Sequence, residues 1–328
     1  MNNERGSSVS LSKMEFIAFT MCCLLIVSGC SSNKPNSVTA ATDTTKTSAP
    51  PAPDFQKQHQ QAEQQFRPQI EAERQKDQKE ADQALDQDAV AAVEQTDDAI
   101  KSIAQNNKAD AMAAIERATG KINILLARNP ASALIPVHSE VVLIDSAPTD
   151  VKAIDQIVQR ATDAVKQRNL PAARILLASV VSELRIRTTS LPLGTYPAAL
   201  QQAARLLDQS KNQDAGNVLL TAVNTLVTVD HVIPIPLLLA QSAIDAANSQ
   251  RQDKQMALIL LQTAKNEADL SRRLGYLGDE SEYKALDQEI ASAETAIKGK
   301  SDASSAFAQL RDRISAFLKR EKEQVQRG

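Results

Sequence analysis

The stretch Pro171-Ala172-Ala173-Arg174-Ile175-Leu176-Leu177 decides the fold, because the chain repeats its pattern of small residues followed by a Leu pair. The pattern returns at residues 214–220 and 255–261, with the final Leu displaced by 43 and then 41 residues. A fainter copy lies at 110–115. A period of about 40 residues is typical of repeats that are built from pairs of helices.

Each copy follows a polar turn, and each turn follows an Ala-rich apolar segment, which indicates two antiparallel helices. The predicted first helices span 154–166, 198–209 and 239–248. We expect four such hairpins, in which Ala lets the helices approach closely and the Leu pairs fill the seam. One hairpin cannot bury its apolar face alone, so neighbours must stack. The predicted fold class is mainly all-α: a compact bundle or a short array of antiparallel helix hairpins.

Extended segments marked by proline follow these hairpins. The steps Ile135-Pro136-Val137, Leu191-Pro192-Leu193 and Ile233-Pro234-Ile235-Pro236 each place proline between apolar residues. Proline ends a helix and favours extended geometry in the residue before it. Residues rich in Val, Ile and Thr surround the steps, and 134–145 is the best candidate for a strand. We therefore expect a minor β element in which the three segments converge at one end of the molecule.

The amino-terminal residues 1–29 have the features of a bacterial lipoprotein signal peptide. An apolar run of 12 residues, 16–27, follows Arg5 and Lys13, and it is shorter than the roughly 20 residues that a transmembrane helix needs. Residues 27–30, Val-Ser-Gly-Cys, resemble a lipobox. This resemblance implies that Cys30 becomes the acylated first residue, with fatty acyl chains such as palmitate anchoring it to the membrane.

The resemblance to lipoproteins also implies a location. The chain would be lipid-anchored on the periplasmic side of the bacterial envelope, and Ser31 after the acylated Cys30 favours transfer to the outer membrane. Residues 30–54 are rich in Ser, Thr, Ala and Pro, a composition that cannot bury enough surface to fold. We interpret them as the acylated Cys followed by a flexible linker.

The remaining segments flank a central domain over 90–278. Residues 55–89 are rich in Gln and charge and show no apolar face before Leu85, which predicts either a solvated, frayed helix from about Pro68 or a disordered arm. Residues 279–328 predict two helices, at 280–298 and 303–326. The last helix has a basic end. This end would lie on an anionic membrane, or the helix would pack its apolar face on the domain and leave the basic residues in solvent.

Composition restricts the chemistry. Cys22 and Cys23 lie in the leader and Cys30 would carry lipid, so the exported domain has no cysteine for a disulfide, a nucleophile or a metal site. The three histidines do not form a metal-binding pair, and the chain has neither a Gly-rich phosphate loop nor a Gly-x-Ser-x-Gly motif. The net charge is −3, and the sequence has no stripe of basic residues of the kind that binds nucleic acid. We expect no catalytic residue, no cofactor and no metal.

One polar cluster accompanies the proline-marked segments. If these segments converge, five side chains would form a polar rim: Arg185, Arg187, Tyr196, Asp230 and His231. The functional interpretation is a small recess that binds a ligand and responds to pH through the histidine. The structural interpretation is that these groups cap helix ends and satisfy carbonyls.

Two of the proline-marked motifs resemble the YfdX family of enterobacterial-type proteins. They are Leu191-Pro192-Leu193-Gly194-Thr195-Tyr196-Pro197-Ala198 and the segment from Asn224 to Leu237, and the likeness extends over about 95–280. The resemblance implies a predominantly α-helical, exported protein that is associated with envelope and acid stress and has no established catalytic activity. The lipobox, the Gln-rich arm and the last helix depart from many family members.

These observations support three functional hypotheses. The first is a non-enzymatic, membrane-tethered periplasmic protein that serves the response to envelope or acid stress and holds other proteins. The second is a structural or assembly module with one dedicated envelope partner, or one that self-associates into a homo-oligomer. The third is a binder of a small ligand at the Asp230-His231 rim.

Overall fold

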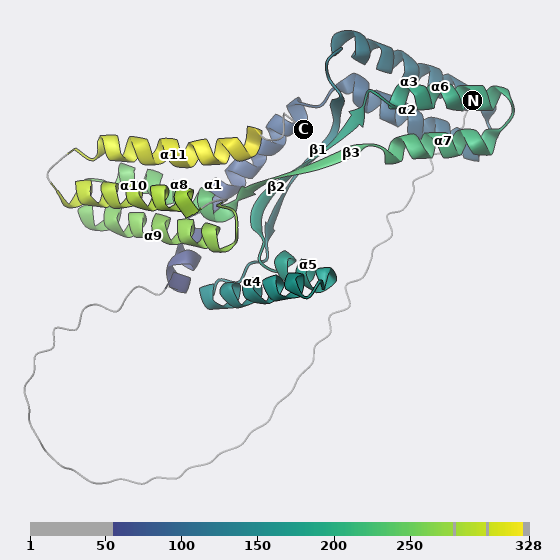
Figure 1. Ribbon diagram of the computed structural model, residues 1–328. Helices are drawn as coiled ribbons and strands as arrows, with labels where there is room; N and C mark the ends of the chain where they lie inside the picture. Colours follow the sequence, from purple (N-terminus) through teal and green to yellow (C-terminus); the bar gives the residue numbers. More distant parts are fainter. Residues whose placement is uncertain (1–54, 278–279, 300–301, 324–328) are drawn as a thin grey trace, which may run out of the picture. The chain divides into compact units, whose positions relative to one another are not determined.

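The computed structural model describes residues 55–277, 280–299 and 302–323 (Figure 1). Within these residues the chain forms helices and one small antiparallel sheet, which confirms the prediction of a mainly α fold with a minor β element. The elements are α1 (Phe55–Gln83), α2 (Gln87–Ala104), α3 (Lys108–Arg128), β1 (Leu134–Asp145), α4 (Val151–Lys166), α5 (Leu170–Ala178), β2 (Ser182–Pro192), α6 (Tyr196–Asp208), α7 (Asn212–Asn224), β3 (Val227–Pro234), α8 (Ile235–Ser249), α9 (Lys254–Arg273), α10 (Glu280–Lys298) and α11 (Ser304–Glu323).

The repeated unit is a helix hairpin followed by a strand. The pairs α2–α3, α4–α5 and α6–α7 lead into β1, β2 and β3, and α8–α9 follows the last strand (Figure 1). The strands lie in the order β1-β2-β3, and each neighbouring pair is antiparallel. Successive hairpins therefore lie at alternate ends of the sheet, with α2–α3 beside α6–α7 at one end and α4–α5 beside α8–α9 at the other.

Three of the hairpins share one turn geometry. Asn106, Arg168 and Ser210 each have a φ close to +58°, at 57°, 58° and 59° respectively. In each turn the following backbone N–H donates to a carbonyl in the last turn of the first helix, as from Asn107 to Ser102. This left-handed ending satisfies carbonyls that the helix leaves open. The shared geometry explains why the sequence repeats at polar turns as well as at apolar helices.

The strand prediction for residues 134–145 is confirmed, since β1 covers Leu134–Asp145. The expectation that all three proline steps converge at one end is wrong. Leu134 pairs with Pro192, which places the first two steps together, but Pro234 pairs with Glu183 at the opposite end of β2. The reason is that β3 runs antiparallel to β2, so proline at the end of both strands falls at opposite ends of the sheet.

The core consists of two apolar clusters. One is built from α2, α3, α6 and α7 together with ends of β1 and β2, and the other from α1, α8, α9, α10 and α11 together with β2 and β3. Ala forms the seam as expected, because Ala92, Ala99 and Ala118 are completely buried. The expectation that Leu pairs fill every seam is wrong for α5 and α7, where Leu177 is 50% and Leu220 is 48% exposed.

The Gln-rich segment 55–89 differs most from its prediction. Instead of fraying or being solvated, it forms a helix from Phe55, with Pro68 inside it, and that helix contributes to a core cluster. Ala62, Phe66 and Ile70 are buried at helical spacing. The buried stripe is narrow and carries only one large apolar side chain per turn, so the surrounding Gln and charged residues conceal its periodicity.

The carboxy-terminal helices also belong to this cluster. Phe307, Leu310 and Ile314 of α11 are buried, so the apolar face of that helix packs on the domain rather than on a membrane. No helix in the described part of the chain is long and apolar enough to cross a bilayer. The predicted leader 1–29, Cys30 and the linker 30–54 lie outside the described residues.

The Ala seam gives a test of the packing. Substitution Ala118→Leu in α3 places three extra carbons in a closed seam, so we expect it to lower the free energy of unfolding by about 1–3 kcal/mol. Ala109→Leu in the same helix is the control, because Ala109 is exposed and Leu is nearly as good a helix former. Urea denaturation of both variants measures the difference. Equal stabilities would contradict the packed seam.

Candidate functional site

Three strands bring part of the predicted polar rim together. Arg187 in β2 donates two hydrogen bonds to Asp230 of β3, at 2.8 and 2.9 Å, and lies 3.4 Å from Glu140 of β1. Both carboxylates are direct register partners of Arg187, so one guanidinium links all three strands. Arg185 lies on the same face and pairs with Glu183, with its Nε donating over 2.9 Å. These four cross-strand groups and Glu183 form an ion-pair ladder on one face of the sheet.

The other two predicted rim residues lie elsewhere. His231 is buried and pairs with Ile186, so it occupies the opposite face of the sheet from Asp230, because adjacent strand residues point to opposite faces. Tyr196 begins α6 and is completely buried in the cluster formed with α2 and α3, where burial raises the pKa of its hydroxyl to about 12. The expected recess that joins Asp230 to His231 is therefore absent.

The ladder is suited to holding the three strands together rather than to catalysis. The hydrogen bonds from Arg187 hold the pKa of Asp230 below its ordinary value, so the carboxylate stays charged and paired. The two side chains are 42% and 34% exposed, and exposed pairs of this kind contribute less than about 1 kcal/mol each. Arg187 and Asp230 satisfy each other's hydrogen bonds, so they are poor candidates for proton transfer.

A second polar group lies buried beneath α1. His59 of α1 lies 2.8 and 3.0 Å from the two carboxylate oxygens of Glu267 of α9, through its Nδ1 atom. Glu63, one turn further along α1, approaches the other ring nitrogen at 3.9 Å. Glu267 is completely buried and His59 is 6% exposed. The pair thus fixes the Gln-rich helix to the fourth hairpin.

Burial and pairing act on the protonation of this group. Burial opposes charge on His59, but the hydrogen bond and negative charge of Glu267 outweigh it and raise the pKa of the imidazole above 6.5. Burial raises the pKa of the Glu267 carboxyl, and the interaction with His59 counteracts part of this rise. Within the described residues no group of His, Cys, Asp or Glu has the arrangement of a metal site. Because both pKa values are raised, His59 and Glu267 bind protons more tightly in the folded protein than in the unfolded chain.

Sequence reasoning missed this pair. His59 shares a face with Ala62, Phe66 and Ile70, and this spacing was the available signal. A polar residue at the end of a short apolar stripe is interpreted as solvent-exposed unless its partner is known. The partner of His59, Glu267, lies 208 residues away in the sequence. No local pattern predicts that pairing.

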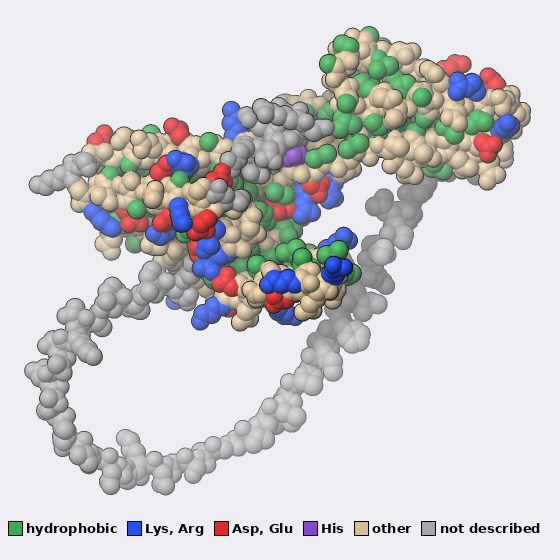
Figure 2. All heavy atoms as spheres, in the orientation of Figure 1, with side chains coloured by type: hydrophobic (Ala, Val, Ile, Leu, Met, Phe, Trp, Pro, Cys, Tyr) green, Lys and Arg blue, Asp and Glu red, His purple; other side chains and the backbone are tan. Residues whose placement is uncertain are grey.

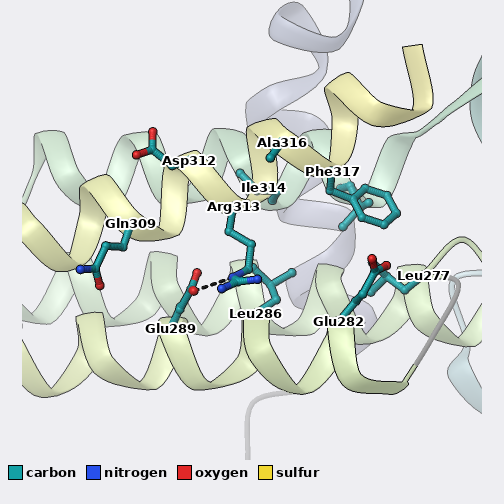
Figure 3. Close-up of a pocket in the computed structure, with 11 residues that line it drawn as sticks. Leu277, Glu282, Leu286, Glu289, Gln309, Asp312, Arg313, Ile314, Ala316 and Phe317 are labelled. Carbon is teal, nitrogen blue, oxygen red and sulfur yellow. Dashed lines mark hydrogen bonds and ion pairs between the residues drawn. The ribbon is translucent and has the colours of Figure 1, made fainter. Parts of the chain in front are cut away.

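A cavity lies between α10 and α11, over α8. It encloses about 670 Å³, and Leu237, Leu286 and Ile314 form its apolar floor. Each of these three side chains is at most 4% exposed. Phe317 of α11 lines one end, and the close-up shows it near Leu277 and Glu282 (Figure 3). We call this cavity the α10–α11 groove.

Charged side chains surround the floor of the α10–α11 groove. Arg313 reaches from α11 to Glu289 of α10 and forms an ion pair across it (Figure 3). Glu282 and Asp312 add two further carboxylates to the lining. An apolar floor with a few polar groups at its edge is the usual composition of a binding site. None of the predicted rim residues lines this groove.

The His59–Glu267 pair predicts a pH dependence of stability. Both pKa values are raised in the folded protein, so it binds more protons than the unfolded chain, and its stability falls as pH rises through the pKa of His59, above 6.5. Urea unfolding between about pH 6 and about pH 8 should show this fall, because carboxylates whose pKa is lowered are already ionised there.

Substitutions separate this pair from other titrating groups. His59→Gln leaves the buried carboxylate of Glu267 without a cation and should cost about 3–5 kcal/mol at neutral pH. Replacing both residues, as His59→Gln with Glu267→Gln, should recover much of that loss and flatten the pH dependence. A fall with pH that persists unchanged in the double variant would contradict this assignment.

Comparisons with known proteins found one matching family. A family model described as YfdX protein matches residues 92–232. A solved structure of Salmonella Typhi YfdX is 12% identical, covers 46% of this chain and 93% of its own, and superposes with a TM-score of 0.32. No curated protein matches the chain. The matched residues contain most of the three hairpins and of the three strands, so residues 92–232 of this chain match the YfdX family, as the motifs predicted.

Proposed function

We propose that the protein is a non-enzymatic interaction protein, tethered to the membrane through Cys30 on the periplasmic side of the bacterial envelope. It would bind apolar segments of other envelope proteins during envelope or acid stress, in the manner of a holdase. The observation that carries this proposal is the α10–α11 groove, with its apolar floor and charged edge.

The shape of the groove favours a protein segment as its occupant. Its lining comes chiefly from two neighbouring helices, so a chain segment can lie along the seam between them, as amphipathic helices do in apolar grooves. The floor of the groove offers apolar contacts that do not select one particular side chain, from Leu237, Leu286 and Ile314. Phe317 adds an aromatic ring at one end. Three carboxylates against one guanidinium favour segments that carry basic residues beside apolar ones.

The amino-terminal region supports a tethered mode of action. A linker of residues 30–54 in extended polyproline form would reach roughly 75 Å at about 3.1 Å per residue. A tether of this length raises the effective concentration of the domain near the membrane and still lets the domain move some distance away from it. Clients that unfold at the membrane surface would then meet the groove at low overall concentration.

Several observations support a role without catalysis. The YfdX family is not known as a family of enzymes. Each charged group of the ion-pair ladder has a partner of opposite charge, and the described residues hold no arrangement of metal ligands. His59 and Glu267 are buried, which keeps substrate away from this pair.

Crosslinking from the groove tests the proposal in intact cells. A photo-crosslinking amino acid at position 317 should trap many unrelated envelope proteins, and the trapped set should grow at mildly acid pH. The same group at position 308, an exposed residue of α11 outside the groove, is the control. One stoichiometric partner at both pH values would favour the assembly module instead, and no trapped protein would refute both.

A purified assay measures how much the groove contributes. Phe317→Asp should reduce protection of an aggregating client by about fivefold or more, because it places a charge on the apolar lining. Phe317→Leu keeps an apolar side chain and should retain most of the protection. Thermal melts of both variants check that α11 still packs. Equal protection by the two variants would remove the groove from the binding site.

A further inference from the structure

The α4–α5 hairpin exposes apolar side chains that no other part of the described chain covers. Ile175 and Leu170 are 72% and 63% exposed, the two highest values among the large apolar residues described. Val165 and Leu177 are each 50% exposed. These four residues, which we call the hairpin apolar patch, belong to neither core cluster. Folding alone therefore does not explain why they are apolar.

Basic residues flank this patch. The hairpin, residues 151–178, contains five basic and two acidic residues, which gives it a net charge of +3 in a chain whose net charge is −3. Both acidic residues are already engaged, Asp155 with Arg273 at 2.7 Å and Asp163 with Lys166 at 3.6 Å. Figure 2 shows blue and green side chains gathered together on this hairpin.

Three arginines remain available to a partner. Arg160, Arg168 and Arg174 are exposed, and none of them forms an ion pair with any described residue. Arg168 sits at the tip of the hairpin in the left-handed conformation, with φ of 58°, directly between the apolar residues Val165 and Leu170. Arg174 lies one turn after Leu170 on α5, so these two side chains share one face of the helix.

We propose that the tip of the α4–α5 hairpin docks on an anionic membrane surface. Apolar side chains beside exposed cations are the composition of segments that lie in the lipid headgroup region, where apolar groups enter the boundary and cations pair with anionic lipids. The contact would be a second membrane attachment, additional to the proposed lipid anchor at Cys30 and separate from the α10–α11 groove.

Charge and shape favour this partner over others. A second copy docking by the same face would bring two surfaces of charge +3 together, which opposes a symmetric dimer. The tip of a two-helix hairpin is convex, and five pockets among the described residues are all lined by elements other than α4 and α5. A flat, deformable anionic surface fits such a tip.

The test uses the full chain reconstituted in vesicles, with a photo-crosslinking amino acid at position 175. We expect crosslinks to phospholipid in vesicles that contain phosphatidylglycerol and few in vesicles of phosphatidylcholine alone. Position 259 of α9 is the control, because Ile259 is apolar and 48% exposed but lies outside the hairpin. A comparison of two positions in one anchored protein separates docking of the hairpin from mere proximity to the bilayer.

Charge variants complete the test. Arg168→Gln with Arg174→Gln should lower the lipid crosslinks from position 175 by about tenfold or more, and added salt should do the same to the unchanged chain. Lys79→Gln with Lys284→Gln removes the same charge from α1 and α10 and should have little effect. Circular dichroism checks folding. Equal lipid crosslinking from positions 175 and 259, or crosslinks from 175 to protein in place of lipid, would overturn the proposal.

Discussion

The pairing of β2 along both of its edges is the constraint on which the rest of the structure depends. Each strand leads from one helix hairpin to the next, so the antiparallel register decides which hairpins become neighbours. It places α2–α3 against α6–α7 and α4–α5 on the side of α8–α9. Arg187 reinforces this register from the centre, because its two carboxylate partners belong to the two outer strands.

The helices with dense, periodic apolar residues were predictable from sequence, and so was β1. The Ala seams and polar turns repeat at a fixed period, and Val, Ile and Pro mark residues 134–145 as extended. Helix α1 was not predictable in the same way, because its buried stripe is narrow and begins with His59. His59 of this helix pairs with Glu267, a residue of a distant hairpin, and a local pattern contains no information about such a contact.

The predicted polar rim fails for a geometric reason. Asp230 and His231 are adjacent in sequence, and a strand sends adjacent side chains to opposite faces. Arg185 and Arg187, two residues apart, do share a face, as the same rule requires. Tyr196 follows the end of β2 and enters a helical core instead. The rim prediction was thus correct for residues two apart on one strand. It was wrong where a strand was interpreted as the end of a helix.

The alternation of hairpin and strand also affects how the sheet can form. Between β1 and β2 lie 36 residues, and between β2 and β3 lie 34, so each strand pairing closes a long segment of chain. A helix hairpin returns the chain to its starting point through local contacts, which form faster than distant ones. Once a hairpin exists, the strands it joins are held near each other and lose less entropy on pairing. The connectivity thus makes a non-local sheet accessible through local folding steps.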